Sequence, residues 1–394
     1  MQLLATSIIA RRRVRPGYLV ATVLVASLVA HAAAAFDWQV EVTPAGELFP
    51  ALDLSQAPRT AASASGTGDG LLSVRLGGRD LPARFEVRVD TPGLREPTRV
   101  EARASGHVVE LHPRLDWDTA QLRALNGVRR QALRVTVLAE GVPAQTKMLD
   151  VRLHPLDDAL YFVREGSARV DLGWAFAGYV DPHDPVVDDV LALARAADPD
   201  FDEPGDDRDA VLRRVAAVWA ALEQRGLTYA PGNPALSRGP SVYSQRVRLL
   251  ADVWRERRAN CIDSSVLIAS VLERLDIATV IVLVPGHAFI GFRAGPGELV
   301  HLETTLLGAS TGAASADARF AAAVSAGRAR WRAVAARVDG RHGPDYAVVD
   351  IAVARRYGIV PLTAERSATA AATPAAVPVD GAADGESGVA VPFD

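Results

Sequence analysis

The sequence predicts an α+β protein of two domains, a β-sandwich followed by a domain that combines helices and strands. Its 394 residues exceed the roughly 100 to 200 of a typical single domain. Short segments of alternating apolar and polar residues, separated by Gly, Pro and Asp, fill residues 36–157. In residues 158–362 the apolar residues recur instead at helical spacing, interrupted by a few unbroken aliphatic runs. These two patterns place the domain boundary near residue 157.

The composition excludes several classes of protein. Lys and Arg number 43 and Asp and Glu 47, so the net charge of −4 leaves no positive excess to neutralise a phosphate backbone, and nucleic acid is not expected as a partner. Hydrophobic residues make up 49% of the chain, enough for a sizeable core. The single cysteine, Cys261, excludes an internal disulfide and a metal site built from several thiolates. A functional Cys261 would act as a nucleophile, and the sequence indicates no cofactor.

Residues 1–35 have the pattern of a secretory signal peptide. Four arginines between Arg11 and Arg15 precede an apolar run, Tyr18–Ala30, and the small residues Ala32–Ala35 follow as a cleavage zone. An uncleaved membrane anchor is the alternative, but a spanning helix needs about 20 apolar residues and this run stops at His31. We therefore expect a cleaved signal and a periplasmic or secreted protein without a membrane span.

Residues 36–157 predict a two-sheet sandwich of the immunoglobulin-like kind. Phe85, Val87 and Val89 alternate with charged residues, which is the period of a half-buried strand. Repeated segments of this length, with turn residues between them, are typical of stacked antiparallel sheets. The expected strands are Trp38–Val42, Leu71–Leu76, Phe85–Val89, Arg99–Ala104, His107–Leu111, Leu133–Leu138 and Met148–Leu153.

No residue of this first domain indicates catalysis. His107, His112 and His154 lie in or beside expected strands, and each is interpreted as a solvated strand residue rather than a ligand. The domain is expected to position or present the one that follows.

After Pro155 the pattern becomes helical, through Tyr161–Arg164 and Trp174–Tyr179. Asp184 before a proline marks a helix start with a capping acid. A second helix is expected from Asp209 to Gly226, and a later helical stretch contains Gln245. These helices would lead the chain toward the cysteine.

His183 lies between two aspartates, Asp181 and Asp184, which raises the alternative of a metal site. A surface turn is preferred, because no second cluster of ligands is visible.

Cys261 is expected at the N-terminus of a buried helix. The apolar residues of that helix are spaced three and four apart, as a buried stripe requires; they are Ile262, Val266, Ala269, Leu272 and Leu275. At the start of a helix the unpaired N–H groups and the positive end of the dipole favour a thiolate. Asp263 is interpreted as a first-turn acid that stabilises this helix start rather than as a catalytic acid.

Three strands follow that helix. Thr279–Val284 is an unbroken aliphatic run, consistent with a central strand buried on both faces. His287–Phe292 and Leu299–Thr305 are separated by a Gly-rich turn and would form a hairpin. Residues equidistant from the turn face one another, so His287 is expected opposite the neighbourhood of Glu303, within hydrogen-bonding reach.

The sequence thus supplies a thiol, an imidazole and a carboxylate in the layout that a cysteine nucleophile needs. His287 would take the proton of the Cys261 thiol, and Glu303 would hold the ring and its tautomer. Gln245 could donate a hydrogen bond to an oxyanion, or could be a helix-surface glutamine. His301 shares a strand face with Glu303 and is an alternative partner for it.

These motifs resemble those of the transglutaminase-like superfamily, whose core is papain-like. The first motif of the family, Gly-x-Cys with a helix ending Leu-x-x-Leu-Gly-Ile, is similar to residues 259–261 and 272–277. Its His-Ala-Trp motif resembles residues 287–289, and its Asp-Pro-Thr motif resembles residues 303–305. The resemblance covers roughly residues 243–306, and it implies a papain-like fold with Cys261, His287 and Glu303 as catalytic residues.

The sequence departs from the family pattern at four positions. Ala259 and Asp276 replace glycines, Phe289 replaces a tryptophan, and Glu303 replaces the usual aspartate. The longer carboxylate of Glu303 must take a different rotamer to reach the same imidazole nitrogen.

The resemblance implies a thiol enzyme that attacks amide bonds of protein or peptide substrates in the cell envelope, as a protease or amidase or by acyl transfer to an amine. The alternative is a catalytically inactive relative that binds a partner or serves as a scaffold. A helix from Arg319 to Val338, a strand at Tyr346–Ile351 and a closing helix and turn at Asp350–Leu362 are expected to complete the domain. Residues 363–394 are expected to be a disordered tail, and the sequence does not determine the oligomeric state.

Overall fold

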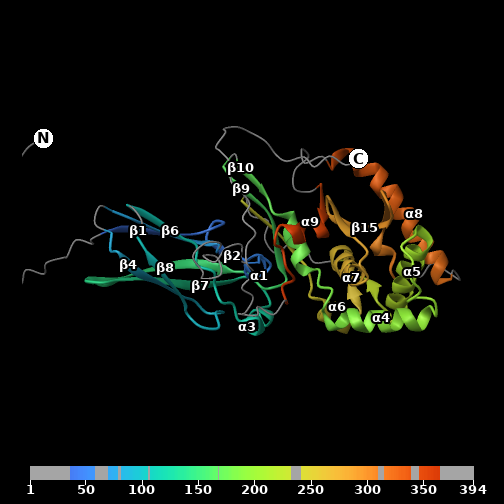
Figure 1. Ribbon diagram of the computed structural model, residues 1–394, viewed down its shortest axis with the longest axis horizontal. Helices are drawn as coiled ribbons and strands as arrows, with labels where there is room; N and C mark the ends of the chain where they lie inside the picture. The colour runs from blue at the N-terminus through green and yellow to red at the C-terminus, as the bar shows by residue number, and fades with distance from the viewer. Residues whose placement is uncertain are drawn as a thin grey trace, which may run out of the picture.

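The computed structural model describes residues 36–57, 70–78, 81–104, 107–166, 168–231, 241–308, 315–338 and 346–363. Within them the protein is α+β and elongated, with sheets at one end and most of the helices at the other (Figure 1). The predicted signal peptide lies outside the described residues, as does all of the predicted tail after residue 363.

The N-terminal part consists of two sheets that share one core. A three-stranded antiparallel sheet has the order β1-β3-β6, and a five-stranded sheet has the order β2-β8-β7-β4-β5. Trp38 and Val74 of the first sheet and Val87 and Val135 of the second belong to the same buried cluster. The strands are β1 (Asp37–Val42), β2 (Glu47–Leu48), β3 (Leu72–Gly77), β4 (Arg84–Asp90), β5 (Thr98–Arg103), β6 (Val108–Leu111), β7 (Arg129–Ala139) and β8 (Val142–Leu153). All seven predicted strands are confirmed, and β2 is added to them.

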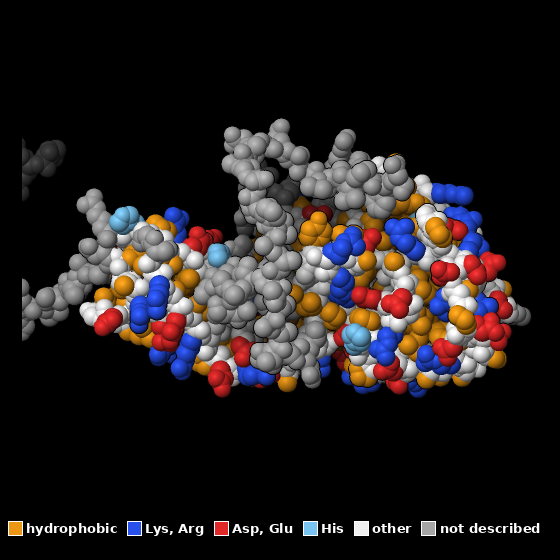
Figure 2. Space-filling model, in the orientation of Figure 1, with side chains coloured by type: hydrophobic (Ala, Val, Ile, Leu, Met, Phe, Trp, Pro, Cys, Tyr) orange, Lys and Arg blue, Asp and Glu red, His pale blue; other side chains and the backbone are white. Residues whose placement is uncertain are grey.

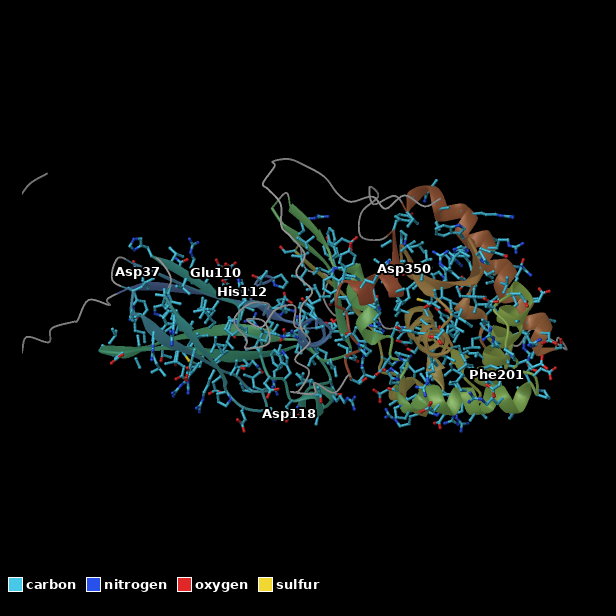
Figure 3. All side chains as sticks on the ribbon, viewed as in Figure 1. Asp37, Glu110, His112, Asp118, Phe201 and Asp350 are labelled. Carbon is cyan, nitrogen blue, oxygen red and sulfur yellow. The ribbon has the colours of Figure 1, made fainter. Side chains whose placement is uncertain are left out.

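Two short helices of this part were not predicted, α1 (Pro50–Leu54) and α3 (Thr119–Arg123). Asp118 caps α3 by accepting the backbone N–H groups of Ala120 and Gln121 (Figure 3). Each helix has five residues, too few to show an apolar period, so the pattern of alternation gave no sign of them.

A third sheet corrects two of the predicted helical segments. Its order is β10-β9-β12, with β9 (Asp158–Glu165), β10 (Ala168–Asp171) and β12 (Val242–Arg246). Tyr161–Arg164 therefore lies in a strand, and so does Gln245. The two segments pair with each other although some 80 residues separate them in the sequence. Phe162 packs against Tyr243 with ring centroids 5.4 Å apart. Pairing between distant strands overrides a local helical period.

Among the described residues of the C-terminal part, six helices surround a four-stranded antiparallel sheet of order β16-β15-β14-β17. The strands are β14 (Thr279–Val284), β15 (His287–Gly295), β16 (Glu298–Leu302) and β17 (Ala347–Asp350), and two short strands, β11 (Thr228–Tyr229) and β13 (Arg258–Ala259), pair in parallel beside them. The helices are α4 (Pro185–Ala197), α5 (Arg208–Gln224), α6 (Leu250–Glu256), α7 (Cys261–Arg274), α8 (Ala316–Val334) and α9 (Ile351–Arg356); η1 (Gly173–Tyr179) is a 3-10 helix.

Strand β14 is buried along its whole length, as predicted, because helices cover both faces of the sheet. Ile281 and Leu283 pack into the main core together with α7. The alternate residues, Val280 and Val282, form a second cluster with Trp331 of α8. The sheet therefore fixes α7 and α8 on opposite sides of the β14–β15–β16 hairpins.

Aspartate side chains cap the N-termini of α4 and α9. Asp184 accepts the N–H of Val186 at 2.9 Å at the start of α4, as predicted, and Asp350 accepts the N–H of Val353 at the start of α9. After α7 the backbone of Asp276 has φ 58°, the left-handed region in which an aspartate is tolerated although glycine is preferred.

His154 corrects the interpretation of the strand histidines. His107 is exposed and His112 is half-buried, but His154 has no exposed surface at all. Its Nδ1 lies 2.6 Å from Asp158 and its Nε2 lies 2.6 Å from Glu47, while its ring stacks on Phe49. Burial alone would lower the pKa of His154, but these two carboxylates outweigh it and raise the pKa above its usual value. The ring, held between these two carboxylates, lies at the junction between the two parts.

The end of the described chain also closes this junction. Residues 358–360 run beside residues 55–57, with the N–H of Val360 donating to Ser55 O at 2.7 Å and the N–H of Ala57 donating to Gly358 O at 2.8 Å. Helix α1 packs against β9 and η1. The first and last described segments thus belong to one structural unit.

Acidic and basic side chains are interspersed on the described surface visible in Figure 2, without a large area of one sign. No helix among the described residues combines the length and the apolarity needed to cross a bilayer.

We predict that His154→Leu lowers the free energy of unfolding by about 3 kcal/mol, because it removes the ring that the buried Asp158 carboxylate binds and leaves Glu47 with Arg152 alone. Urea unfolding at pH 7, followed by tryptophan fluorescence, measures the change. His107→Leu, at an exposed position, is the control and should stay within about 0.5 kcal/mol of the parent. Equal losses in the two variants would contradict a stabilising role for the buried network.

Candidate active site

Cys261 is the first residue of α7, and a capping box fixes its backbone. The side chain of Asn260 accepts the N–H groups of Ile262 and Asp263 at 3.0 and 2.9 Å, and the Asp263 carboxylate accepts the N–H of Asn260 at 3.0 Å. Arg248 pairs with the same carboxylate at 3.0 Å. Asp263 therefore stabilises the helix start, as its position in the first turn predicted.

The thiol lies at the end of a rigid helix and remains reachable from solvent. Every residue of α7 from Ile262 to Leu272 is buried, whereas Cys261 is only half-buried and its thiol is free. The hydroxyl of Ser265 donates to the Cys261 carbonyl at 2.6 Å, and that of Thr304 donates to it at 3.3 Å. These two hydroxyls hold the backbone of Cys261 in place.

The hairpin of β15 and β16 brings His287 and Glu303 together. Ile290 pairs with Leu302 at the end of the ladder, so the start of one strand meets the end of the other. Nε2 of His287 lies 2.9 Å from Oε2 of Glu303. The glutamate therefore reaches the ring despite its extra methylene group.

Glu303 is not a strand residue, which corrects the predicted end of the second strand. Strand β16 stops at Leu302, and Glu303 caps the short 3-10 turn η2 (Thr304–Leu306). Its Oε1 accepts the backbone N–H of Thr305 at 3.2 Å and the hydroxyl of Thr305 at 2.7 Å. These two donors hold the carboxylate so that Oε2 points at the imidazole.

Arg330 is a further residue of the site that sequence reasoning missed. It comes from α8, and its Nε donates to Oε2 of Glu303 at 2.6 Å. The Glu303 side chain is 3% exposed and that of Arg330 is 43% exposed, so the pair links a buried acid to the surface. Nothing distinguishes Arg330 from the other arginines of α8 in the sequence, because only the packing of α8 on the sheet selects it.

The charges of the pair follow from these contacts. Burial alone would raise the pKa of Glu303, but hydrogen bonds from His287 and Thr305 outweigh it and lower this pKa to about 2. Burial alone would lower the pKa of His287, but hydrogen bonding to Cys261 and Glu303 outweighs it and raises this pKa to about 9. At neutral pH the ring is therefore an imidazolium.

His301 does not compete for Glu303. Its ring stacks on Trp331 of α8 with centroids 4.5 Å apart and lies 6.0 Å from the ring of Phe289. Burial lowers the pKa of His301 to about 4, so this ring is neutral where His287 is charged. Its Nε2 has no hydrogen-bond partner among the residues that the structure describes. His301 is part of the packing beneath the pair.

Gln245 lies on a strand rather than a helix, and Tyr229 is a neighbour of Cys261 that the sequence did not indicate. Gln245 lies on strand β12 and its Nε2 donates to the backbone carbonyl of Arg246 at 3.0 Å, so its role at an oxyanion stays a prediction. Tyr229, which the sequence did not single out, pairs with Ala259 in the short parallel sheet next to Cys261. Burial raises the pKa of Tyr229, as do the charges of Cys261 and Glu303, so the phenol lies within electrostatic range of both groups.

The turn at His183 is held by a hydrogen bond between its backbone and the side chain of Asp181. The N–H of His183 donates to Asp181 at 2.9 Å, while Asp184 caps α4. In the described ranges no group of three or more His, Cys, Asp or Glu side chains is arranged to hold a metal ion.

Comparison with models of known protein families finds no match for this sequence, and comparison with curated proteins finds none either. The resemblance to the transglutaminase-like superfamily stays a prediction from the motifs. The case for a function therefore depends on the geometry of Cys261, His287 and Glu303.

We predict that Glu303→Gln lowers the pKa of the His287 ring clearly below 9, because the charge that opposes its burial is removed. A pKa raised in the folded state stabilises the protein fully below about 6.5, and this contribution is lost as the pH rises through 9. Titration of the ring proton by NMR measures the change.

The matched control is Glu298→Gln in the same hairpin, where the carboxylate instead binds Arg208 at the surface. It should leave the titration of His287 as in the parent. A ring that still titrates near pH 9 in Glu303→Gln would contradict the role of the carboxylate.

Proposed function

We propose that this protein is a thiol-dependent amide-bond enzyme of the transglutaminase-like type, in which a papain-like domain follows an immunoglobulin-like sandwich. One observation carries the proposal: the imidazole of His287 hydrogen-bonds the buried Glu303 carboxylate at 2.9 Å, and the thiol at the start of α7 is, with that carboxylate, one of the two groups that raise the pKa of the ring. Because Nε2 is taken by Glu303, Nδ1 is the nitrogen left to exchange a proton with Cys261.

The first half of the reaction is acyl transfer to sulfur. The Cys261 thiolate attacks the carbonyl carbon of an amide and forms a C–S bond. As the C–N bond breaks, the His287 imidazolium gives its proton to the leaving nitrogen, so the products are a thioester and a free amine. Glu303 stays ionised throughout and holds the ring in line with the sulfur.

The second half regenerates the thiolate. The neutral imidazole takes a proton from water, whose oxygen attacks the thioester carbon, and the C–S bond breaks to release a carboxylic acid. An amine in place of water would give a cross-link. We favour hydrolysis of protein or peptide substrates, because no feature of the sequence indicates an amine-binding site. The predicted signal peptide places this activity in the periplasm or outside the cell.

We predict that Cys261→Ala removes at least about 99.9% of the amide-bond activity, because no other side chain at the site can form the acyl intermediate. Casein cleavage and incorporation of a fluorescent amine into a glutamine donor measure hydrolysis and transfer separately. Glu303→Gln should lose activity as well, while Glu298→Gln should retain it. Activity of Cys261→Ala equal to that of the parent would exclude the nucleophile.

The inactive binding protein is distinguished by alkylation. The chain has one cysteine, so mass spectrometry of the iodoacetamide product reports Cys261 alone. An active site predicts fast alkylation that depends on the pH and slows in His287→Ala. Alkylation that is slow in the parent, and indifferent to pH between about 5 and 8, would favour the binding protein.

A further inference from the structure

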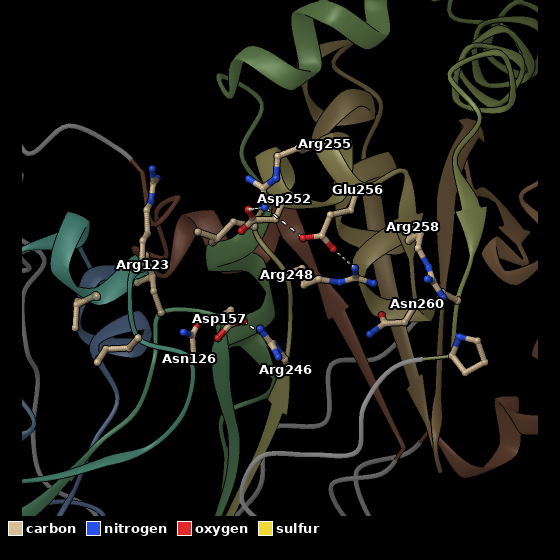
Figure 4. A pocket seen from close by; sticks show the side chains of 16 residues that line it. Arg123, Asn126, Asp157, Arg246, Arg248, Asp252, Arg255, Glu256, Arg258 and Asn260 are labelled. Carbon is tan, nitrogen blue, oxygen red and sulfur yellow. Dashed lines mark hydrogen bonds and ion pairs between the residues drawn. The ribbon is translucent and has the colours of Figure 1, made fainter.

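A cavity of about 490 Å³ opens beside the candidate active site, between α3 of the N-terminal part and α6 of the C-terminal part (Figure 4). Its size lies within the range of roughly 300 to 1,000 Å³ that is typical of sites for small ligands. Asn260, the residue before the proposed nucleophile, forms part of its wall, and so does Ala230, the residue after Tyr229. A group bound in this cavity would therefore lie against the residue that precedes Cys261 in the chain.

Arginine dominates the wall of the cavity. Five arginines face three acids, and these residues are Arg123, Arg246, Arg248, Arg255, Arg258, Asp157, Asp252 and Glu256. Each acid already has a partner: Arg246 binds Asp157 at 2.6 Å, Arg248 binds Glu256 at 3.0 Å, and Arg255 binds Asp252 at 2.5 Å. Arg248 also binds Asp263 at 3.0 Å, behind the wall, and two guanidinium charges have no carboxylate partner in the wall.

These two charges belong to Arg123 and Arg258. Neither has an ion pair or a hydrogen bond to another side chain within the part of the chain that the structure describes. Arg258 is exposed and lies on β13, two residues before Asn260 and three before Cys261. Arg123 ends α3 on the opposite wall (Figure 4). Arg258 is therefore the guanidinium available to a ligand, whereas the charge of Arg123 also acts on Asp184.

Asn260 adds a neutral donor. Its Oδ1 is used by the N–H groups of the first turn of α7, which leaves the amide NH₂ group without an acceptor among the described residues. Figure 4 shows this amide directed toward the guanidinium groups of Arg246 and Arg248. The groups of the wall that are not already paired are thus hydrogen-bond donors.

We propose that this cavity binds a carboxylate of the substrate, carried by an acidic side chain or a chain terminus next to the amide that Cys261 attacks. The inference rests on the proposed function and assigns its substrate class. A guanidinium presents two parallel N–H groups to the two oxygens of a carboxylate, and the Asn260 amide supplies a third donor. The unbalanced charge is small and the wall carries three carboxylates, so a monoanion suits it better than a phosphate dianion.

Binding is tested without the thiol chemistry. The full-length Cys261→Ala chain is titrated calorimetrically with acetyl-Ala-Glu-Ala amide and with its Gln counterpart. We expect the Glu peptide to bind at least about tenfold more tightly, and the difference to vanish in a second variant that adds Arg258→Gln. Arg356→Gln, which removes an exposed arginine of α9 outside the cavity, is the charge-matched control and should keep the preference.

Three results would overturn the proposal. They are equal affinity for the two peptides, a preference that survives Arg258→Gln, and the absence of binding of the Glu peptide up to about 10 mM. Inorganic phosphate that binds more tightly than the Glu peptide would assign the cavity to phosphate and would also overturn it.

A second measurement separates this proposal from the proposed function. The parent is alkylated with chloroacetyl-Ala-Glu amide and chloroacetyl-Ala-Gln amide, and the ratio of the two rates is compared with that in Arg258→Gln. A ratio of about ten that falls toward one supports the cavity. Slow alkylation by both probes, with preferential binding of the Glu peptide retained, would refute the thiol enzyme and leave the carboxylate site standing. Fast alkylation by both at equal rates would refute the site alone.

Discussion

The carboxylate of Glu303 is the interaction on which the candidate site depends. It is almost completely buried, and a buried charge without partners would cost several kcal/mol. Its two oxygens accept hydrogen bonds from His287, Thr305 and Arg330, which come from the start of β15, the turn η2 and helix α8. One charged group therefore ties three elements together, and the same contacts orient the imidazole.

The position of the sulfur is fixed by other elements than the position of the ring. Helix α7 is buried along its length against β14 and β15, and the capping box of Asn260 and Asp263 fixes where that helix begins. The position of the thiol thus follows from the packing of the helix, and the position of the ring follows from the hairpin. The arginine-lined cavity needs yet another segment, since Arg123 belongs to the N-terminal part. Chemistry and substrate recognition would then meet only where the two parts of the protein join.

Much of this arrangement was visible in the sequence, but not all of it. The alternation of apolar and polar residues predicted the strands of the two N-terminal sheets. The spacing of Ile262, Val266 and Leu272 predicted the helix that begins at Cys261. Both predictions succeeded because both patterns are local. The same local patterns failed for Tyr161–Arg164 and for Gln245. Both segments lie in strands whose hydrogen-bond partners are distant in the chain.

The sequence alone determined the order of thiol, imidazole and acid, the helix that carries the thiol and the strand that carries the imidazole, and the absence of any second cysteine. It did so because hydrophobic period, helix starts and turn residues are properties of neighbouring residues. Only the tertiary structure decided which charges meet. In the sequence His154 resembles an ordinary strand residue, and only the fold brings Glu47 and Asp158 to its ring. Arg330 is distinguished from other arginines only by the packing of α8 on the sheet, and Arg258 only by the junction of the two parts. Electrostatic partners are selected by distance in space, which no spacing along the chain encodes.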